Sequence, residues 1–339
     1  MVPYRLPFRK PYVTSRGRLD HREMVLLRIR GSSGVEGLGE AVPLSLRGGT
    51  EIETVVAELE RWGDGATSGE AALPASSPAR CAVSTALADL EAREAGVPLR
   101  RLLSPGSGPR TISCNATLSS GSPQEVAAEA EVWAADGFRT FKLKVGPGSG
   151  AEQVEAVRSV LGPDALIRID ANGTWDVNLA AGHLAELEPH GIELAEQPVF
   201  DLAGMALLRQ GSPVPLVADE SVSGPEQAEE AARLGACDAV TVKLSKTGSL
   251  DPSLGGYLPV YLSSALDGPV GIAAAAHVAC TLPADGPFAD AAHGLATGRL
   301  FAASIAIEDP VLNGPSLTVP AGPGLGITID EAALQRHRL

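Results

Sequence analysis

Five charged residues recur along the middle of the chain at nearly equal intervals. They are Lys144, Asp170, Glu196, Asp219 and Lys243, and the successive gaps are 26, 26, 23 and 24 residues. Each gap has the length of one strand-plus-helix unit, so we expect all five side chains at the same end of neighbouring parallel strands. Three converging carboxylates repel one another, and a hard cation such as Mg²⁺, with Mn²⁺ as a substitute, removes that cost. The spacing therefore predicts a metal site with Asp170, Glu196 and Asp219 as ligands.

The lysines at the two ends of this series predict acid–base chemistry. Lys144 and Lys243 would reach opposite faces of a bound substrate, which suits removal of a proton α to a carboxylate while the metal stabilises the enediolate. Lys142 shares a strand face with Lys144, and its charge, like that of the metal, would lower the pKa of Lys144 so that it can act as a base. A single acid at a strand end is usually a helix cap, and two lysines alone would be a solvated strand face. Their common register favours a site.

The elements that must position these residues are short apolar strands alternating with alanine-rich helices from about residue 111 onward. The predicted strands are 112–118, 140–145, 166–171, 192–198, 215–220, 239–244, 259–264 and a weaker one within 288–297. Eight such units over roughly 200 residues predict a (β/α) barrel over 111–309. A doubly wound open sheet is the alternative, and it is disfavoured because no GxGxxG motif follows the first strand. The segment after the sixth strand predicts a very short or missing helix.

Residues 1–110 have a different pattern and predict an α+β unit. Segments 23–30 and 38–42 alternate like strands, and 50–63 and 81–98 carry apolar residues at helical spacing. The expected organisation is an N-terminal α+β domain followed by the barrel.

Composition narrows the class of protein. The 339 residues carry a formal net charge of −14, which makes general nucleic-acid binding a poor expectation. The four cysteines form no CxxC pair and are expected to be buried thiols. The N-terminus lacks the apolar core of a signal peptide, and no apolar run is long enough for a membrane span, so a cytoplasmic enzyme is expected.

Taken together, these motifs resemble those of the enolase superfamily, in its muconate lactonizing branch. The matching segments are Lys142-Leu143-Lys144, Asp170-Ala171-Asn172, Glu196-Gln197-Pro198, Asp219-Glu220-Ser221 and Lys243-Leu244-Ser245-Lys246, together with 37–43 and 81–98. The resemblance implies a modified TIM (β/α) barrel with an N-terminal α+β capping domain, on which the C-terminal tail 310–339 also packs. It also implies that Lys144 is the base and that Lys243 acts from the opposite face. The flexible segment 9–17 is expected to cover the substrate.

Within this branch the sequence is most similar to o-succinylbenzoate synthases. The similarity lies in Ser263-Ser264 followed by Asp267, in Gly294 to Thr297 and in Asn115 on the first strand. It implies a dehydration that forms 2-succinylbenzoate in menaquinone biosynthesis. The substrate-binding residues that it implies are Ser263, Ser264, Asn115, Asn172 and Gly294. A strand-end turn is the other interpretation of the serine pair.

Several alternatives stay open. An N-succinylamino acid racemase or a dipeptide epimerase would use the same lysine pair, and muconate cycloisomerase is a further enzyme candidate. Dipeptide epimerases usually carry acids after strand eight, and 293–297 contains none. The intact lysines and carboxylates disfavour a non-catalytic binding barrel. His293 could approach the site, but a structural role is the stronger interpretation. The expected partner is a small-molecule carboxylate, and a homo-oligomer is one option.

Overall fold

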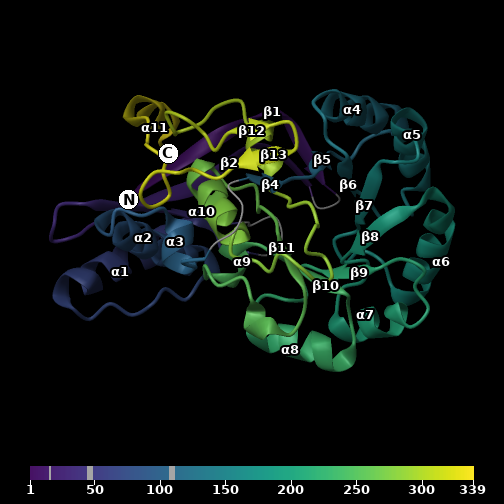
Figure 1. The fold of residues 1–339 in the computed structure, drawn as a ribbon, viewed down its shortest axis with the longest axis horizontal. Coiled ribbons are helices and arrows are strands. Elements are labelled where there is room, and N and C mark those ends of the chain that lie inside the picture. The colour runs from purple at the N-terminus through teal and green to yellow at the C-terminus, as the bar shows by residue number, and fades with distance from the viewer. Residues whose placement is uncertain (15–16, 44–48, 107–110) are drawn as a thin grey trace.

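The computed structural model describes residues 1–14, 17–43, 49–106 and 111–339. Two regions are visible in Figure 1: an antiparallel sheet with its helices on one side, and a curved parallel sheet wrapped by helices on the other. This arrangement confirms the predicted enolase-like fold, a capping domain joined to a modified barrel.

The capping domain is built on a three-stranded antiparallel sheet. Its strands are β1 (Val2–Thr14), β2 (Gly17–Arg30) and β3 (Glu36–Ala41), and its helices are α1 (Ile52–Ser68), α2 (Ser77–Glu94) and α3 (Leu99–Leu103). Helix α2 packs directly on β3. A Cβ atom at Gly37 or Gly39 would lie 2.1 Å from Ala86 O or 1.9 Å from Ala82 O, so only glycine allows this approach.

The loop predicted over 9–17 is instead strand over most of its length, and its expected role in covering the substrate stays a prediction. Residues up to Thr14 belong to β1 and Gly17 begins β2, with Tyr12 opposite Leu19 and Thr14 opposite Gly17. The pairing shifts between Pro7 and Tyr12, which obscures the alternation in the sequence. Residues 15–16 lie outside the described part of the chain.

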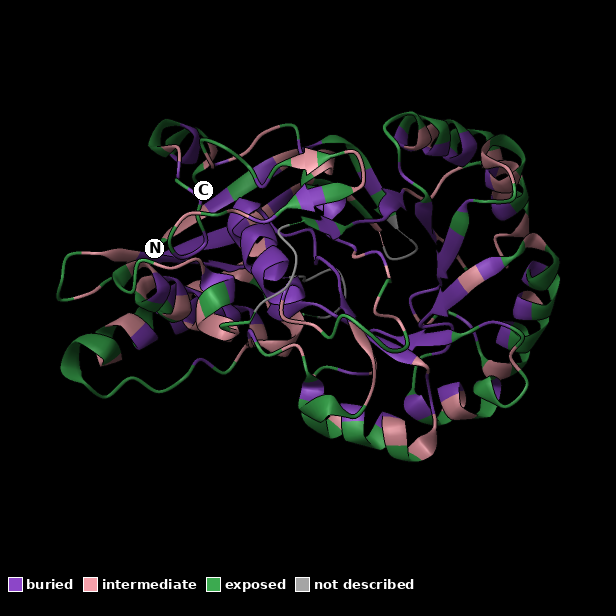
Figure 2. Cartoon of the chain, in the orientation of Figure 1, coloured by how far each residue is buried: buried purple, intermediate pink, exposed green. Residues whose placement is uncertain are grey.

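The parallel sheet has seven strands in consecutive order. They are β5 (Ala116–Leu118), β6 (Thr140–Lys144), β7 (Leu166–Asp170), β8 (Ile192–Glu196), β9 (Leu216–Ala218), β10 (Ala239–Val242) and β11 (Val260–Leu262). The helices between them are α4 (Pro123–Ala135), α5 (Ala151–Leu161), α6 (Val177–Leu187) with the 3-10 turn η2 (Glu188–His190), α7 (Leu202–Arg209) and α8 (Pro225–Leu234). Figure 2 shows mostly buried strands inside and exposed helix faces outside, as expected for parallel β-α units.

The first and eighth predicted strands differ from the others. Segment 112–118 divides, because β4 (Thr111–Ser113) pairs antiparallel with β13 (Ser316–Thr318), itself paired with β12 (Leu312–Asn313). Within 288–297 only His293 and Gly294 form isolated bridges, so the prediction of a strand there is wrong. Their backbone nevertheless hydrogen-bonds to Ser113 at the end of β4 and to Leu262 at the end of β11.

The sixth helix is very short, as predicted. It consists of α9 (Leu244–Thr247), followed by the turn η3 (Leu254–Gly256). A cavity of about 1220 Å³ lies beside this segment and is lined by Tyr257, Leu258 and Phe288 among others. None of the predicted catalytic or metal-binding residues lines this cavity.

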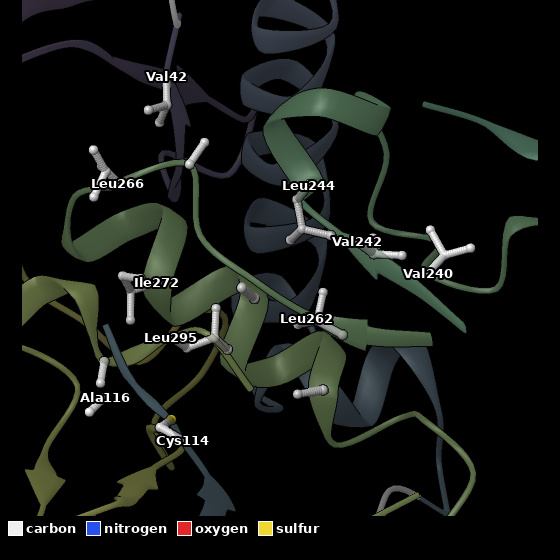
Figure 3. Packing of buried hydrophobic residues seen from close by; sticks show 14 of the residues in the cluster. Val42, Cys114, Ala116, Val240, Val242, Leu244, Leu262, Leu266, Ile272 and Leu295 are labelled. Carbon is white, nitrogen blue, oxygen red and sulfur yellow. The ribbon is translucent and has the colours of Figure 1, made fainter. Parts of the chain in front are cut away.

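The remaining elements bring the capping domain and barrel together. Helix α10 (Pro269–Ala279) and the turn η4 (Ala296–Leu300) follow the seventh strand and the His293–Gly294 bridges. Helix α11 (Glu331–His337) reaches the capping domain through an ion pair of 2.5 Å between Arg28 and Glu331. One apolar cluster spans both domains, and Figure 3 shows Val42, Leu266 and Leu295 within it.

Two predictions about the described residues can be checked directly. The four cysteines are buried and free, as expected. No helix in the described part of the chain is long and apolar enough to cross a membrane.

Candidate active site

Strand register brings the predicted carboxylates into one row. Lys144 lies opposite Asp170 across β6 and β7, and Asp170 lies opposite Glu196 across β7 and β8. Asp219 follows the end of β9, the next strand of the sheet. All three carboxylate side chains are fully buried. The regular spacing in the sequence therefore corresponds to neighbouring positions at the carboxyl ends of adjacent strands.

Lys142 lies between two of these carboxylates. Its Nζ is 2.6 Å from Glu196 Oε1 and 3.0 Å from Asp170 Oδ2. Burial acts to lower the pKa of Lys142, but the combined attraction of Asp170 and Glu196 is larger, and the pKa rises well above its ordinary value. Lys142 therefore remains a cation, and one positive group is shared by two carboxylates.

Lys144 lies at one end of the carboxylate row. Its Nζ forms an ion pair with Asp170 Oδ2 and donates a hydrogen bond of 3.2 Å to Asn172 Oδ1. Asn172 also donates from its backbone N to Asp170 Oδ1 and from Nδ2 to Glu220 Oε1, both at 3.0 Å. Its φ of 51° places the backbone in the left-handed region, which asparagine tolerates better than most residues. Asn172 thus holds Asp170 and contacts the predicted base.

Lys243 lies at the other end of the row. Its Nζ forms an ion pair with Asp219 Oδ2, and Lys246 Nζ is 2.8 Å from Asp219 Oδ1. Lys246 lies in the single turn of α9, three residues after Lys243, so both ammonium groups reach the same carboxylate. Lys144 and Lys243 therefore pair with the first and the third carboxylate of the row.

Three contributing residues were given no role in the sequence analysis: Lys246 and Gln197, which lie within its matching segments, and Tyr261. Gln197 Oε1 accepts hydrogen bonds from the backbone N of Asp219 at 2.8 Å and of Ser221 at 3.2 Å. Tyr261 donates from its hydroxyl to Glu196 Oε2 at 3.2 Å. The available signals were the adjacency of Gln197 to Glu196 and the one-turn spacing of Lys246 from Lys243, whereas Tyr261 is identifiable only once the barrel is formed.

Burial disfavours the charged form of Glu196, the middle carboxylate of the row. It raises the pKa of Glu196, and the attraction of Lys142 only partly offsets this rise. The attraction of a further cation near Glu196 would therefore offset more of the cost of keeping this buried carboxylate ionised.

The substrate-binding residues implied by the similarity to o-succinylbenzoate synthases do not all lie in one place. Asn115, Ser263 and Gly294 lie together, because Ser263 bridges Gly294 and Asn115 N donates to His293 O at 2.9 Å. Ser264 is engaged elsewhere: its hydroxyl donates to Asp267 Oδ2 at 2.7 Å and accepts from Asp267 N at 2.8 Å. This is the geometry of a strand-end turn, the other interpretation of the serine pair.

His293 has a structural role in the described residues. Its Nδ1 accepts a hydrogen bond of 3.1 Å from Leu262 N. Burial, together with the nearby charge of Arg168, lowers the pKa of His293 to about 4, so the ring is neutral near pH 7. The expectation that His293 is structural rather than catalytic agrees with these contacts.

The donor chemistry suits a hard divalent cation. Asp170, Glu196 and Asp219 supply only oxygen atoms from adjacent strands, and the position of Lys142 shows that one cation can lie between two of them. In the described residues these carboxylates pair with lysines, and no group of three His, Cys, Asp or Glu side chains is arranged to hold a metal ion. The residue types fit Mg²⁺, and the binding itself is a proposal.

Comparison with known proteins defines what this chain resembles. Residues 1–104 match the N-terminal domain of the mandelate racemase/muconate lactonizing enzyme family, and residues 125–333 match the enolase C-terminal domain-like family. The D-Ala-D/L-Ala epimerase of Cytophaga hutchinsonii is 32% identical over 80% of each chain. The L-Ala-D/L-Glu epimerase of Bacillus subtilis is 30% identical over 95% of this chain and 93% of its own.

Three solved structures share the fold over nearly the whole chain. The N-succinyl Arg/Lys racemase of Bacillus cereus has a TM-score of 0.90 at 25% identity, covering 100% of this chain and 96% of its own. The muconate lactonizing enzyme of Pseudomonas fluorescens, complexed with muconolactone, has a TM-score of 0.90 at 28% identity, covering 100% and 97%. A dipeptide epimerase of Cytophaga hutchinsonii, complexed with Mg and a dipeptide, has a TM-score of 0.88 at 27% identity, covering 99% and 98%.

Proposed function

The chain belongs to the mandelate racemase/muconate lactonizing enzyme family of the enolase superfamily, and from this we propose that it racemises or epimerises an N-acylated amino acid. One observation carries the proposal: Lys144 and Lys243 pair with opposite ends of the same row of carboxylates. Two bases on opposite sides of a substrate can remove a proton from one face and return a proton to the other.

The proposed roles of the residues follow from their positions. Lys144 accepts the proton from the carbon α to the substrate carboxylate in its deprotonated form, which the ion pair with Asp170 disfavours and a cation held by Asp170 would favour. The ammonium of Lys243 donates a proton to the opposite face. In the reverse direction the two lysines exchange roles. Lys142, which remains charged, lies beside the forming negative charge and offsets it. Gln197 and Tyr261 hold Asp219 and Glu196 in place through their hydrogen bonds.

Asp170, Glu196 and Asp219 would hold Mg²⁺, with Mn²⁺ as a substitute. When bound, the ion would supply positive charge beside the substrate carboxylate and lower the cost of negative charge on its oxygen atoms. The presence of Mg in a related dipeptide epimerase supports this assignment.

The substrate class follows from the far side of the site. A dipeptide carries a free ammonium group, which needs an acid near it, and 293–297 contains none. An N-succinyl or similar acyl group carries a carboxylate instead. The hydroxyl of Ser263, whose backbone bridges Gly294, is a hydrogen-bond donor of the kind that such a carboxylate accepts. An N-succinylamino acid is therefore favoured over a dipeptide, and the similarity to the Bacillus cereus racemase supports this choice.

A second candidate is o-succinylbenzoate synthase. The same base would remove the α-proton and then return it to the departing hydroxyl of the cyclohexadiene substrate. The Ser263-Ser264 segment favours it, but Ser264 is bonded to Asp267, and the relatives reported above are epimerases, a racemase and a muconate lactonizing enzyme. Muconate cycloisomerase remains a third candidate because the muconate lactonizing enzyme of Pseudomonas fluorescens is among these relatives.

Proton NMR in deuterated water tests the proposal. Purified protein with Mg²⁺ is supplied separately with N-succinyl-L-arginine, L-Ala-L-Glu, cis,cis-muconate and 2-succinyl-6-hydroxy-2,4-cyclohexadiene-1-carboxylate. Loss of the α-proton signal and appearance of the D-enantiomer from the N-succinyl substrate, both abolished by EDTA, are expected. Formation of 2-succinylbenzoate or of muconolactone with no α-deuteration of the amino acid would contradict the proposal.

A further inference from the structure

A buried polar cluster joins the capping domain to the segment that follows the seventh barrel strand. Each strand of the cap contributes one side chain: Tyr4 from β1, Arg22 from β2 and Glu40 from β3. All three are buried, at 0%, 5% and 2% exposure. Polar groups are rarely placed in such a position unless each finds a partner, so their contacts identify what they hold.

Glu40 caps a helix that belongs to the other domain. Helix α10 begins after Gly268, which has no side chain with which to cap it. Gly271, the third residue of the helix, donates from its backbone N to Glu40 Oε2 at 3.0 Å, and Tyr4 donates from its hydroxyl to Oε1. The first N–H groups of a helix lack partners within it, and a carboxylate at that end satisfies them and the helix dipole.

The segment before α10 is held at a second point. Arg22 Nη2 donates to Ala265 O at 3.3 Å, and Ala265 N donates to Asp267 Oδ2 at 2.8 Å. Between them Leu266 has a φ of 65°, a conformation that is strained for a leucine. Such a backbone persists only when its surroundings hold it, and here the capping domain supplies part of that hold.

Two glycines provide independent support for this close approach. A Cβ atom at Gly268 would lie 2.5 Å from both Glu40 Oε1 and Tyr4 OH, and one at Gly271 would lie 2.7 Å from Asp267 Cβ and 2.8 Å from Glu40 Oε2. Neither glycine has a positive φ, so the space is needed for the carboxylate rather than for the backbone conformation. The start of α10 is therefore shaped around Glu40.

The held segment leads directly into the candidate site. Ser263 and Glu40 line the same small cavity of about 10 Å³, and Ser263 bridges Gly294. Ser263 N also donates to Val242 O at 2.8 Å, one residue before Lys243. A shift of 263–268 would therefore move the Ser263 hydroxyl assigned to the acyl carboxylate, while Lys144 and the row of carboxylates lie on other strands.

We propose that Glu40 is a positioning residue through which the capping domain holds residues 263–268, and with them the binding site for the acyl end of the substrate. This inference rests on the proposed function for the identity of the substrate. It assigns control of acyl-group binding to a cap residue that acts through the start of α10, without touching the substrate.

The experiment compares Glu40→Ala with the full-length wild-type protein by two measurements. Hydrogen–deuterium exchange should show at least tenfold faster exchange of backbone amides in 264–272, with the strands β6 to β8 unchanged. With N-succinyl-L-arginine and Mg²⁺, KM should rise about tenfold while kcat stays within threefold. The exchange measurement needs no substrate, so it separates failure of this inference from failure of the proposed function.

Two further variants keep the test decisive. Tyr4→Phe removes only the hydroxyl that contacts Glu40, and it should produce the same pattern at smaller size, with a KM rise of about threefold. Glu36→Gln, on the same strand but paired with Arg30 at the surface, should change neither measurement. The inference is overturned if Glu40→Ala exchanges like wild type or lowers kcat with KM unchanged. If Glu40→Ala does not fold, Tyr4→Phe with unchanged exchange and KM overturns it.

Discussion

Replacing Glu40 by glutamine should change how the stability of the protein depends on pH. Burial raises the pKa of Glu40 from 4.5 to about 7, helped by the charge of Asp267, and the bonds from Tyr4 and Gly271 only partly oppose the rise. Arg22 and Cys81 are the other ionisable groups around this cluster. Glutamine keeps the size of the side chain but has no proton to release.

The sign follows from comparing the folded and unfolded states. Below pH 4.5 the carboxyl is protonated in both states. As the pH rises from 4.5 to 7 the unfolded chain releases this proton while the folded protein keeps it, so the free energy of unfolding falls. Above pH 7 the carboxyl of Glu40 is ionised in both states, and its contribution to the free energy of unfolding stays constant. At about 1.4 kcal/mol per pKa unit, a rise from 4.5 to about 7 corresponds to about 3 kcal/mol in full.

The assay is chemical unfolding followed by fluorescence of the three tryptophans at pH 5 and pH 8. Part of the decrease in the free energy of unfolding has already occurred at pH 5. Between pH 5 and pH 8 the free energy of unfolding of wild type should therefore fall by about 2–3 kcal/mol more than that of Glu40→Gln. Glu36→Gln is the matched control: Arg30 lowers the pKa of Glu36, so the folded protein does not take up a proton at this residue between pH 5 and pH 8 and its contribution changes little over the range. A constant difference between wild type and Glu40→Gln from pH 5 to pH 8 would refute the reasoning.

Three other predictions follow from the site. Lys142→Met leaves two buried carboxylates without their shared cation, and the free energy of unfolding measured in urea without Mg²⁺ should fall by about 3 kcal/mol; an unchanged value would contradict the pairing. Asp219→Asn should weaken Mg²⁺ binding at least tenfold in isothermal titration calorimetry, and equal affinity would remove Asp219 from the ligand set. Tyr261→Phe takes a hydrogen-bond donor from buried Glu196 and should lower the free energy of unfolding by about 1–2 kcal/mol, whereas no change would show that this bond contributes nothing.

The row of carboxylates was predictable from sequence because parallel strands convert a chain spacing into a spatial one. Gaps of one β-α unit place side chains at the same end of adjacent strands, and the register of Lys144, Asp170 and Glu196 follows that rule. The short sixth helix was predictable from a single segment, since the residues after Lys243 lack helical periodicity.

Other features depend on contacts between distant segments. Residues 111–113 pair with the C-terminal β13, which divides the first predicted strand, and nothing local indicates this. The eighth strand is reduced to two isolated bridges, of His293 with Cys114 and of Gly294 with Ser263, which depend on segments far away in the sequence. Tyr261 and Glu40 were missed for the same reason, since their partners lie 65 and 231 residues away.

The most direct test of the account is α-proton exchange from each enantiomer of N-succinylarginine by Lys144→Ala and Lys243→Ala in deuterated water. Both variants should lose racemisation by at least 10³-fold, since each lacks one of the two bases. Each should still exchange the α-proton of one enantiomer, and the two variants should retain opposite enantiomers. Racemisation within tenfold of wild type in either variant, or retention of the same enantiomer by both, would contradict two bases on opposite faces.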